Sequence, residues 1–259
     1  MTLSISGSRN GVLANKVALV LGASRGIGAA TARALGRAGA DVVVAARDAV
    51  ALEAVASSIR EEGARAMAIP TDILDDTQVA RVVARTVEAF GGLDVAFNNA
   101  GSGHLPAPLA DLTVQDFDDA IGINLRGILV AMKFELGAML ARGGGSIVNM
   151  SSTAGLQGVR GMSAYSATKH AIIGATKSAA LDYAAKNIRL NVVAPGPILT
   201  DRLRALPVER RAPIERAVPM GRVGLVEEVA STVVYLASDA AAFVTGAVLP
   251  VDGGRAAGA

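Results

Sequence analysis

Seven short apolar runs, separated by helix-favouring stretches, constrain the fold of this 259-residue chain more than any other feature. The runs are rich in Val, Ile, Leu and Ala, which is typical of strands buried on both faces of a sheet. They span residues 17–21, 41–46, 66–70, 93–97, 146–150, 190–193 and 247–251. Strands that alternate with helices imply βαβ units. We therefore predict an α/β fold, a doubly wound parallel sheet of these seven strands flanked by helices on both faces.

The helices are expected between these runs, at residues 26–35, 51–62, 77–90, 114–140, 164–185 and 226–238. The alternation continues without a linker or a break in composition, so we expect one domain over residues 14–259. Residues 1–13 are polar and rich in small side chains, and we interpret them as a flexible leader.

The composition argues against several classes of protein. The chain has 25 basic and 23 acidic residues and no dense Lys/Arg block, so we expect no nucleic-acid partner. It has no cysteine, which suits a reducing cytoplasm and excludes thiolate chemistry. No signal peptide and no apolar window long enough for a bilayer are visible, so we expect no membrane association. No cluster of His, Asp and Glu suggests a metal.

A glycine-rich turn follows the first predicted strand, where an open α/β sheet binds its ligands. Glycines let the backbone turn tightly and approach a pyrophosphate, and the next helix offers free N–H groups at its N-terminus. The spacing G-x-x-x-G-x-G differs from the general dinucleotide fingerprint, and a strand-to-helix turn without a ligand would look similar. We predict a phosphate cradle made of Gly22, Ser24, Arg25, Gly26, Ile27 and Gly28.

The end of the second strand bears on the choice of cofactor. Asp41 opens that strand, at the wrong end for a ligand, and Arg47 follows its last residue. Arg47, together with Arg25, is suited to pair with a 2′-phosphate. We therefore expect NADP(H) to be preferred, with NAD(H) as the alternative. Plain solvent exposure would also account for both arginines, and the nearby Asp48 weakens the preference.

The next two strands end in further candidates for cofactor binding. Asp72 and Ile73 follow the third strand, and Asp72 is suited to accept a hydrogen bond from an adenine amino group. The alternative is a helix N-cap, which Asp72 or Asp75 would supply. After the fourth strand, Asn99, Ala100 and Gly101 are small enough to let a cofactor lie against the strand end.

Tyr165 and Lys169 form the strongest local signal for chemistry. Residues four apart lie on one face of a helix. A nearby ammonium group would favour the phenolate of Tyr165, whose pKa is ordinarily about 10. A tyrosine brought toward neutral pH exchanges a proton with a carbonyl or alcohol oxygen. Lys169 is also suited to hold ribose hydroxyls.

Two further polar residues accompany this pair. Ser152 follows the fifth strand and is suited to donate to a substrate oxygen, although a turn or cap serine would look the same. Asn124 lies within a long predicted helix, where asparagine is a mediocre former. It would hold a water molecule linking Lys169 to solvent, or serve as a satisfied polar group between helices.

Taken together and in order, these motifs resemble the single-domain short-chain dehydrogenase/reductases, from about residue 14 to residue 254. The resemblance rests on the glycine turn, Asn98 to Gly101, Asn124, Ser152, Tyr165-x-x-x-Lys169, Pro195-Gly196 and the tail at 243–254. It implies a Rossmann-like fold and a catalytic tetrad of Asn124, Ser152, Tyr165 and Lys169. It also implies that Tyr165 and Lys169 contact the cofactor, with nicotinamide contacts from Pro195, Gly196, Ile198 and Thr200.

The resemblance further implies a homotetramer, or else a dimer, built on the helices that contain Asn124 and Tyr165. Leu21 stands where the family usually has threonine, so we expect altered packing there and retained binding. The spacing of Tyr165 and Lys169 argues against the enoyl reductases of the superfamily, in which these two residues lie further apart.

The substrate site is less well defined by the sequence. The segment 201–220 carries five arginines, which would face either an acidic carrier or plain solvent. We name His104, Gln157 and Leu203 as candidate substrate contacts, and for His104 an ordinary loop position is an equal alternative. The leading hypothesis is an NADP(H)-dependent oxidoreductase that reduces a ketone reversibly, with Tyr165 as general acid/base. The alternatives are a 3-oxoacyl reductase acting on carrier- or coenzyme A-linked substrates, and a non-catalytic NADP-binding scaffold or sensor.

Overall fold

The computed structural model describes residues 11–258, and its centre is a seven-stranded sheet in the order β3-β2-β1-β4-β5-β6-β7. Every neighbouring pair of strands is parallel. The strands are β1 (Val17–Leu21), β2 (Asp41–Ala46), β3 (Ala66–Pro70), β4 (Val95–Asn98), β5 (Gly145–Met150), β6 (Ile188–Pro195) and β7 (Val248–Val251). The predicted doubly wound parallel sheet is confirmed.

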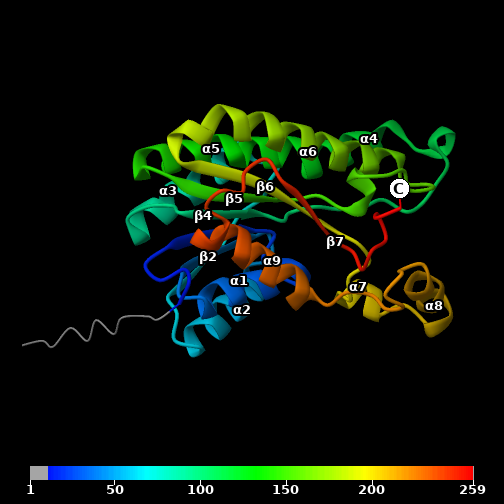
Figure 1. The fold of residues 1–259 in the computed structure, drawn as a ribbon, viewed down its shortest axis with the longest axis horizontal. Coiled ribbons are helices and arrows are strands. Elements are labelled where there is room, and N and C mark those ends of the chain that lie inside the picture. The colour runs from blue at the N-terminus through cyan, green and yellow to red at the C-terminus, as the bar shows by residue number, and fades with distance from the viewer. Residues whose placement is uncertain (1–10, 259) are drawn as a thin grey trace, which may run out of the picture.

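Helices cover both faces of this sheet (Figure 1). One face carries α1 (Gly26–Arg37), α2 (Ala49–Glu61) and α9 (Val226–Ala237). The other carries α3 (Asp76–Phe90), α5 (Gly127–Arg142) and α6 (Ser163–Tyr183). Two short helices, α7 (Asp201–Arg204) and α8 (Val208–Arg216), project beyond the ends of the strands. None of the helices within residues 11–258 has the length and apolar character needed to cross a bilayer.

The strands bury side chains on both faces, which explains their apolar runs. In β1, Ala18 and Val20 join the core beneath α1 and α2, whereas Leu19 and Leu21 join the core beneath α3 and α5. All four are nearly inaccessible to solvent. Burying a leucine or valine side chain contributes about 1.5–3 kcal/mol, so the central strand stabilises both layers.

The long helix expected at residues 114–140 has a different internal geometry. It begins as α4 (Val114–Ile121), capped by Thr113 and Asp116, widens into a π-helical turn at Gly122–Arg126, and continues as α5. A Cβ at Gly127 would lie 2.6 Å from Ile73 Cγ1 and 2.9 Å from the Ile73 carbonyl oxygen, so only glycine permits this approach. Asn124 lies within the π turn, a feature often found at functional sites.

The predicted flexible leader ends too late in the chain, because its last residue, Leu13, is part of the folded domain. Residues 1–10 lie outside the described residues, but Leu13 is only 1% exposed and belongs to the core beneath α1. Its backbone N–H donates to the Ala38 carbonyl oxygen at 2.9 Å. A single leucine in a polar segment gave no periodic signal, and tertiary packing fixes its position.

Leu13 therefore contributes to stability, and its neighbour Val12 provides a matched control because it is 66% exposed. We expect Leu13→Ala to lower the free energy of unfolding by about 2–5 kcal/mol, because it leaves a cavity in the core. Val12→Ala should change it by less than about 0.5 kcal/mol. Urea denaturation of both variants checks this, and equal stability of the two would contradict the packing of residues 11–13.

Candidate active site

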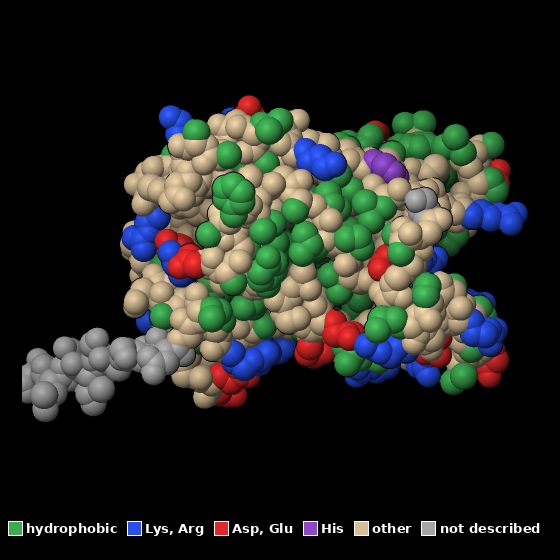
Figure 2. All heavy atoms as spheres, viewed as in Figure 1, with side chains coloured by type: hydrophobic (Ala, Val, Ile, Leu, Met, Phe, Trp, Pro, Cys, Tyr) green, Lys and Arg blue, Asp and Glu red, His purple; other side chains and the backbone are tan. Residues whose placement is uncertain are grey.

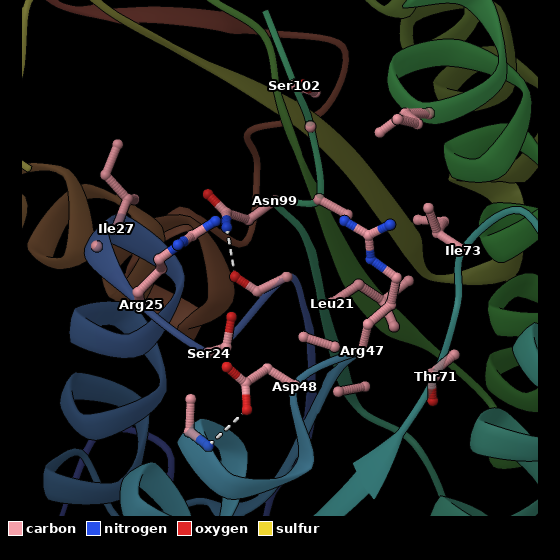
Figure 3. Close-up of a pocket in the computed structure, with 18 of the residues that line it drawn as sticks. Leu21, Ser24, Arg25, Ile27, Arg47, Asp48, Thr71, Ile73, Asn99 and Ser102 are labelled. Atoms are coloured by element: carbon pink, nitrogen blue, oxygen red, sulfur yellow. Dashed lines mark hydrogen bonds between the residues drawn. The ribbon is translucent and has the colours of Figure 1, made fainter. Parts of the chain in front are cut away.

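A cavity of about 900 Å³ opens at the carboxyl ends of β1 to β4 (Figure 3). It lies where the strand order reverses, since β1 pairs with β2 on one side and with β4 on the other. Most of the predicted cofactor residues line it: Gly22, Ser24, Arg25, Gly26, Ile27, Arg47, Asp72, Ile73, Asn99, Ala100, Gly101 and Thr200. Residues predicted from loops distant in the chain thus form one contiguous wall.

The backbone of the glycine turn lies so close to the end of β4 that no side chain fits between them. Gly22 has φ +77°, and a Cβ there would lie 2.7 Å from the Ala100 nitrogen. Asn99 Nδ2 donates to the Gly22 carbonyl oxygen at 2.8 Å, which joins the ends of β1 and β4. Gly28 does not line the cavity, and a Cβ there would lie 2.2 Å from that same carbonyl oxygen. Gly28 thus serves close packing behind the turn.

The N-terminus of α1 faces the cavity and has an open capping position. Arg25 is the N-cap residue, and its side chain forms no capping hydrogen bond within residues 11–258. The first N–H groups of the helix, and the positive end of its dipole, are therefore available to an anion.

Two arginines and one aspartate border the outer part of the cavity. The side chains of Arg25 and Arg47 both point into it, from the α1 side and from the end of β2 (Figure 3). Asp48 is the N-cap of α2 and accepts from the Ala51 N–H at 3.0 Å. Asp41 lies at the opposite end of β2, where it pairs with Arg65 at 3.1 Å. This part of the cavity wall thus carries two cations and one capping carboxylate.

The structure separates the two aspartates that follow β3. Asp75 is the N-cap of α3 and accepts from the N–H groups of Thr77 and Gln78 at 2.9 and 3.1 Å. Asp72 lines the cavity, and its carboxylate accepts from the Leu74 N–H at 3.0 Å. Asp75 therefore takes the capping role, which leaves Asp72 at the cavity wall.

Lys169 and Asn124 lie directly behind the cavity wall. A Cβ at Gly101 would lie 2.9 Å from Asn124 Oδ1 and 3.5 Å from Lys169 Nζ. Lys169 is 2% exposed, and its Nζ donates to the Met150 carbonyl oxygen at 2.9 Å. The same Nζ lies 5.5 Å from the centre of the Tyr165 ring. The expected helical proximity of Tyr165 and Lys169 is thus present, next to the wall residue Gly101.

The electrostatics of this pair differ from the expectation. Burial raises the pKa of Tyr165 above its ordinary value, while a hydrogen bond with Ser152 and the charge of Arg202 lower it. Burial also lowers the pKa of Lys169 to about 8. Among the described residues the cation that lowers the Tyr165 pKa is therefore Arg202, because Lys169 is itself desolvated and directed to Met150.

Asn124 and Ser152 each have a structural partner that the sequence did not reveal. Asn124 Oδ1 accepts from the Ser102 N–H, and its Nδ2 donates to the Ser102 carbonyl oxygen, both at 2.8 Å. Asn124 thus fastens the loop after β4 to the π turn. Ser152 accepts from the Ala154 N–H at 3.1 Å as a turn cap, and it also bonds Tyr165.

Several predicted residues do not belong to the cavity wall. Pro195 ends β6, Gly196 packs against Asp252, and Ile198 is 7% exposed and bridges to Gly224. His104, Gln157 and Leu203 are also absent from the wall. His104 Nδ1 contacts the Leu105 carbonyl oxygen at 2.8 Å, Gln157 lies in the turn after Ser152, and Leu203 is half-buried in α7.

The sequence analysis counted Arg202 only among the arginines of 201–220, and the structure places it in the cavity wall. Sequence reasoning missed Glu135, which is fully buried on α5. Asn98 Nδ2 donates to Glu135 Oε2 and to Asn149 Oδ1, each at 2.9 Å. Asn149 Nδ2 donates in turn to Thr176 Oγ1 at 2.9 Å. This polar network joins β4, β5, α5 and α6 beside the site. Its signal in the sequence is one acid in an otherwise apolar helix face, because glutamate is rarely buried.

The buried carboxyl of Glu135 leads us to predict a pH dependence of the free energy of unfolding. Burial raises its pKa from 4.5 to about 7, so between these values the folded chain holds a proton that the unfolded chain has released. Stability from this group therefore falls as pH rises from about 4.5 through about 7. Glu135→Gln removes this dependence. We therefore compare the free energy of unfolding of the variant with that of wild type at each pH. This difference should shift by about 3 kcal/mol in favour of the variant's stability between about pH 4 and about pH 8.

Urea denaturation of wild type and Glu135→Gln at both pH values measures this difference, and all other titrating groups cancel. Parallel pH dependence of the two proteins would show that Glu135 is ionised in the folded chain.

Comparisons with known proteins agree with this geometry. Residues 22–256 match the family described as Enoyl-(Acyl carrier protein) reductase. The chain is 45% identical to cis-4-hydroxycyclohexanecarboxylate dehydrogenase of Sinomonas cyclohexanicum, over 94% of this chain and 98% of that protein. It is 40% identical to a 3-oxoacyl-[acyl-carrier-protein] reductase of Synechocystis, over 93% and 97%.

Among solved structures, the crystal structure of levodione reductase superposes with a TM-score of 0.92 at 33% identity, covering 95% of this chain and 100% of the other. The sheet order, the cavity and these matches agree, and the chain belongs to the short-chain dehydrogenase/reductase family of oxidoreductases.

Proposed function

We propose that the protein is an NADP(H)-dependent oxidoreductase that reversibly reduces a ketone to a secondary alcohol, with Tyr165 as the general acid/base. The observation that carries the proposal is the position of Lys169 beside Tyr165 and behind the wall residue Gly101, where Lys169 Nζ would lie 3.5 Å from a Cβ on Gly101. A proton-transfer pair thus lies directly behind the wall of a dinucleotide-sized cavity.

The cavity fits a nicotinamide dinucleotide. Its turn has no room for a Cβ at Gly22, and α1 presents its N-terminus to the same space. Gly22, Ser24, Gly26 and Ile27 would hold the pyrophosphate, and Arg25 with Arg47 would hold a 2′-phosphate. Asp72 would bind the adenine, and Asn99 to Gly101 with Thr200 would border the rest. When bound, the dinucleotide supplies or accepts the hydride.

The residues of the chain then manage the proton and the oxygen. Tyr165 gives its phenolic proton to the carbonyl oxygen, or takes one from the alcohol. Ser152, whose hydroxyl interacts with Tyr165 and lowers its pKa, orients that oxygen. Lys169 Nζ lies 5.5 Å from the centre of the Tyr165 ring, and its lowered pKa makes it able to exchange a proton near neutral pH. Asn124 holds the Ser102 loop beside them.

Cyclic ketones are the first substrates to test, because a relative that is 45% identical is named as a dehydrogenase of cis-4-hydroxycyclohexanecarboxylate. The Tyr165-x-x-x-Lys169 spacing favours carbonyl over enoyl reduction. Reduction of a 3-oxoacyl thioester is the second candidate, supported by a 40% identical relative and by the arginines of α7 and α8. That surface also carries acids, among them Glu215 paired with Arg211 at 3.0 Å, and Figure 2 shows both signs there. The mixed charge favours the first candidate.

The non-catalytic scaffold is a weaker alternative, since a pure binder does not require Tyr165 beside Lys169. For assembly, we propose a homotetramer, or else a dimer, built on α5 and α6. Both helices expose leucines, at Leu129, Leu140 and Leu181. Closed symmetric oligomers commonly cover such surfaces.

Turnover by Tyr165→Phe tests the reaction class. We expect its kcat/KM for ketone reduction to fall about 100-fold or more, because the proton donor is lost. Tyr183→Phe, on the same helix, is the matched control and should retain activity.

Assays following NADPH oxidation would use cyclohexanone and a 3-oxoacyl thioester in parallel, and the better substrate decides between the two candidates. Near-full turnover by Tyr165→Phe would rule out the mechanism.

Cofactor preference tests the role of Arg47. We expect wild type to prefer NADPH, and Arg47→Leu to lower kcat/KM for NADPH about 10- to 100-fold with little effect on NADH, because a charge-assisted bond to the 2′-phosphate is lost. Arg37→Leu, at the far end of α1 in an exposed pair with Glu62, is the control. An equal loss with both cofactors, or a wild-type preference for NADH, would argue against the assignment.

A further inference from the structure

Arg202 occupies a position that neither the cofactor cradle nor the proton-transfer pair explains. It lies on α7, two residues after Thr200, and lines the cavity with Thr200 and Asp201. Thr200 Cγ2 lies 3.4 Å from the position of a Cβ on Gly26, which places this segment opposite the glycine turn. α7 therefore closes the cavity on the side away from β2 and β3.

The guanidinium of Arg202 is unpaired. It forms no hydrogen bond and no ion pair with any residue between 11 and 258, whereas Arg211 in α8 and Arg222 beyond it are paired with Glu215 and Glu228. A cation that lines a cavity and has no ion-pair partner among the described residues is suited to an anionic group of a ligand. The planar guanidinium matches a carboxylate with two parallel hydrogen bonds.

The position of Arg202 indicates which part of a ligand it meets. Arg25 and Arg47 serve the adenosine end of the cavity, beside the end of β2. Arg202 instead lines the cavity together with Gly101, behind which Lys169 lies beside Tyr165, and its charge lowers the pKa of that phenol. Among the five arginines of α7 and α8, only Arg202 both lines the cavity and acts on Tyr165. An anion bound by Arg202 thus lies near the reacting carbonyl.

We propose that Arg202 is a specificity-determining residue that binds a carboxylate of the substrate, so that the preferred substrates are keto acids and hydroxy acids. This inference rests on the proposed function, because it places the reacting oxygen at Tyr165 and Ser152. The carboxylate of such a substrate lies at Arg202 while its carbonyl lies at Tyr165. The acid is therefore preferred over a neutral substrate of the same shape.

A pair of substrates that differ in charge tests the proposal. The probes are 4-oxocyclohexanecarboxylate and its methyl ester, with cyclohexanone as the unsubstituted reference. We expect wild type to prefer the acid over the ester, and Arg202→Met to lower the acid-to-ester ratio of kcat/KM about 10- to 100-fold. Loss of the Arg202 charge also alters the pKa of Tyr165, but this effect is common to both substrates and cancels in the ratio. The acid-to-ester ratio of Arg202→Lys should fall between those of wild type and Arg202→Met. Lysine keeps the positive charge but cannot form the two parallel hydrogen bonds of a guanidinium.

Arg204→Met is the matched control, since Arg204 lies on the same short helix, is exposed and does not line the cavity. It should leave the acid-to-ester ratio unchanged. An equal loss for acid and ester in Arg202→Met would show a structural role and overturn the proposal. Weaker NADPH binding with an unchanged acid-to-ester ratio would assign Arg202 to a cofactor phosphate and also overturn it.

Failure of the proposed function gives a different result. If none of the three ketones is reduced, calorimetric binding of cyclohexanecarboxylate to the enzyme with NADP⁺ still tests Arg202. Binding to wild type that is lost in Arg202→Met would uphold the carboxylate site although the reaction class fails. Equal binding to both proteins, or no binding to wild type, would overturn it.

Discussion

The parallel pairing of β1 with both β2 and β4 is the constraint on which the rest of the structure depends. The register sets Leu21, the last residue of β1, opposite Ala45 in β2 and Asn98 in β4. Three strands therefore end at one level, and the loops that carry Gly22, Arg47 and Asn99 leave the sheet together. Because the strand order reverses at β1, these loops separate and leave a cavity between them. The hydrogen bond from Asn99 to the Gly22 carbonyl oxygen joins the loops after β4 and β1 at the base of this cavity.

A second set of interactions joins the cavity to the helices behind it. Asn98 and Asn149, on neighbouring strands, bond one another and reach Glu135 on α5 and Thr176 on α6. Lys169 bonds the Met150 carbonyl oxygen, and Ser151 Oγ donates to the Lys169 carbonyl oxygen at 2.9 Å. Burying these polar groups has a desolvation cost, which their hydrogen bonds offset in part, since Asn98 Oδ1 and Glu135 Oε1 have no partner among the described residues. The network thus ties the ends of β4 and β5 to the helix that carries Tyr165.

The fold and most of the cavity wall could be predicted from the sequence, because both depend on local patterns. Apolar runs and their period locate the strands, and a glycine-rich turn between a strand and a helix is typical of a phosphate-binding loop. The remainder depends on tertiary contacts. Asn124 bonds Ser102 only because the π turn and the approach at Gly127 bring them together. The effect of Arg202 on Tyr165 joins segments 37 residues apart in the sequence, and the buried state of Glu135 requires four elements at once.

Transfer of deuterium from NADPH doubly deuterated at the nicotinamide C4 is the most direct test of the proposed hydride transfer. The wild-type protein would be incubated with this cofactor and cyclohexanone, and the product alcohol analysed by mass spectrometry after exchange into ordinary water. We expect one deuterium to be retained on the carbinol carbon, because a hydride moves from the ring and the proton comes from Tyr165. Unlabelled alcohol, or no alcohol despite tight binding of the cofactor, would contradict this mechanism.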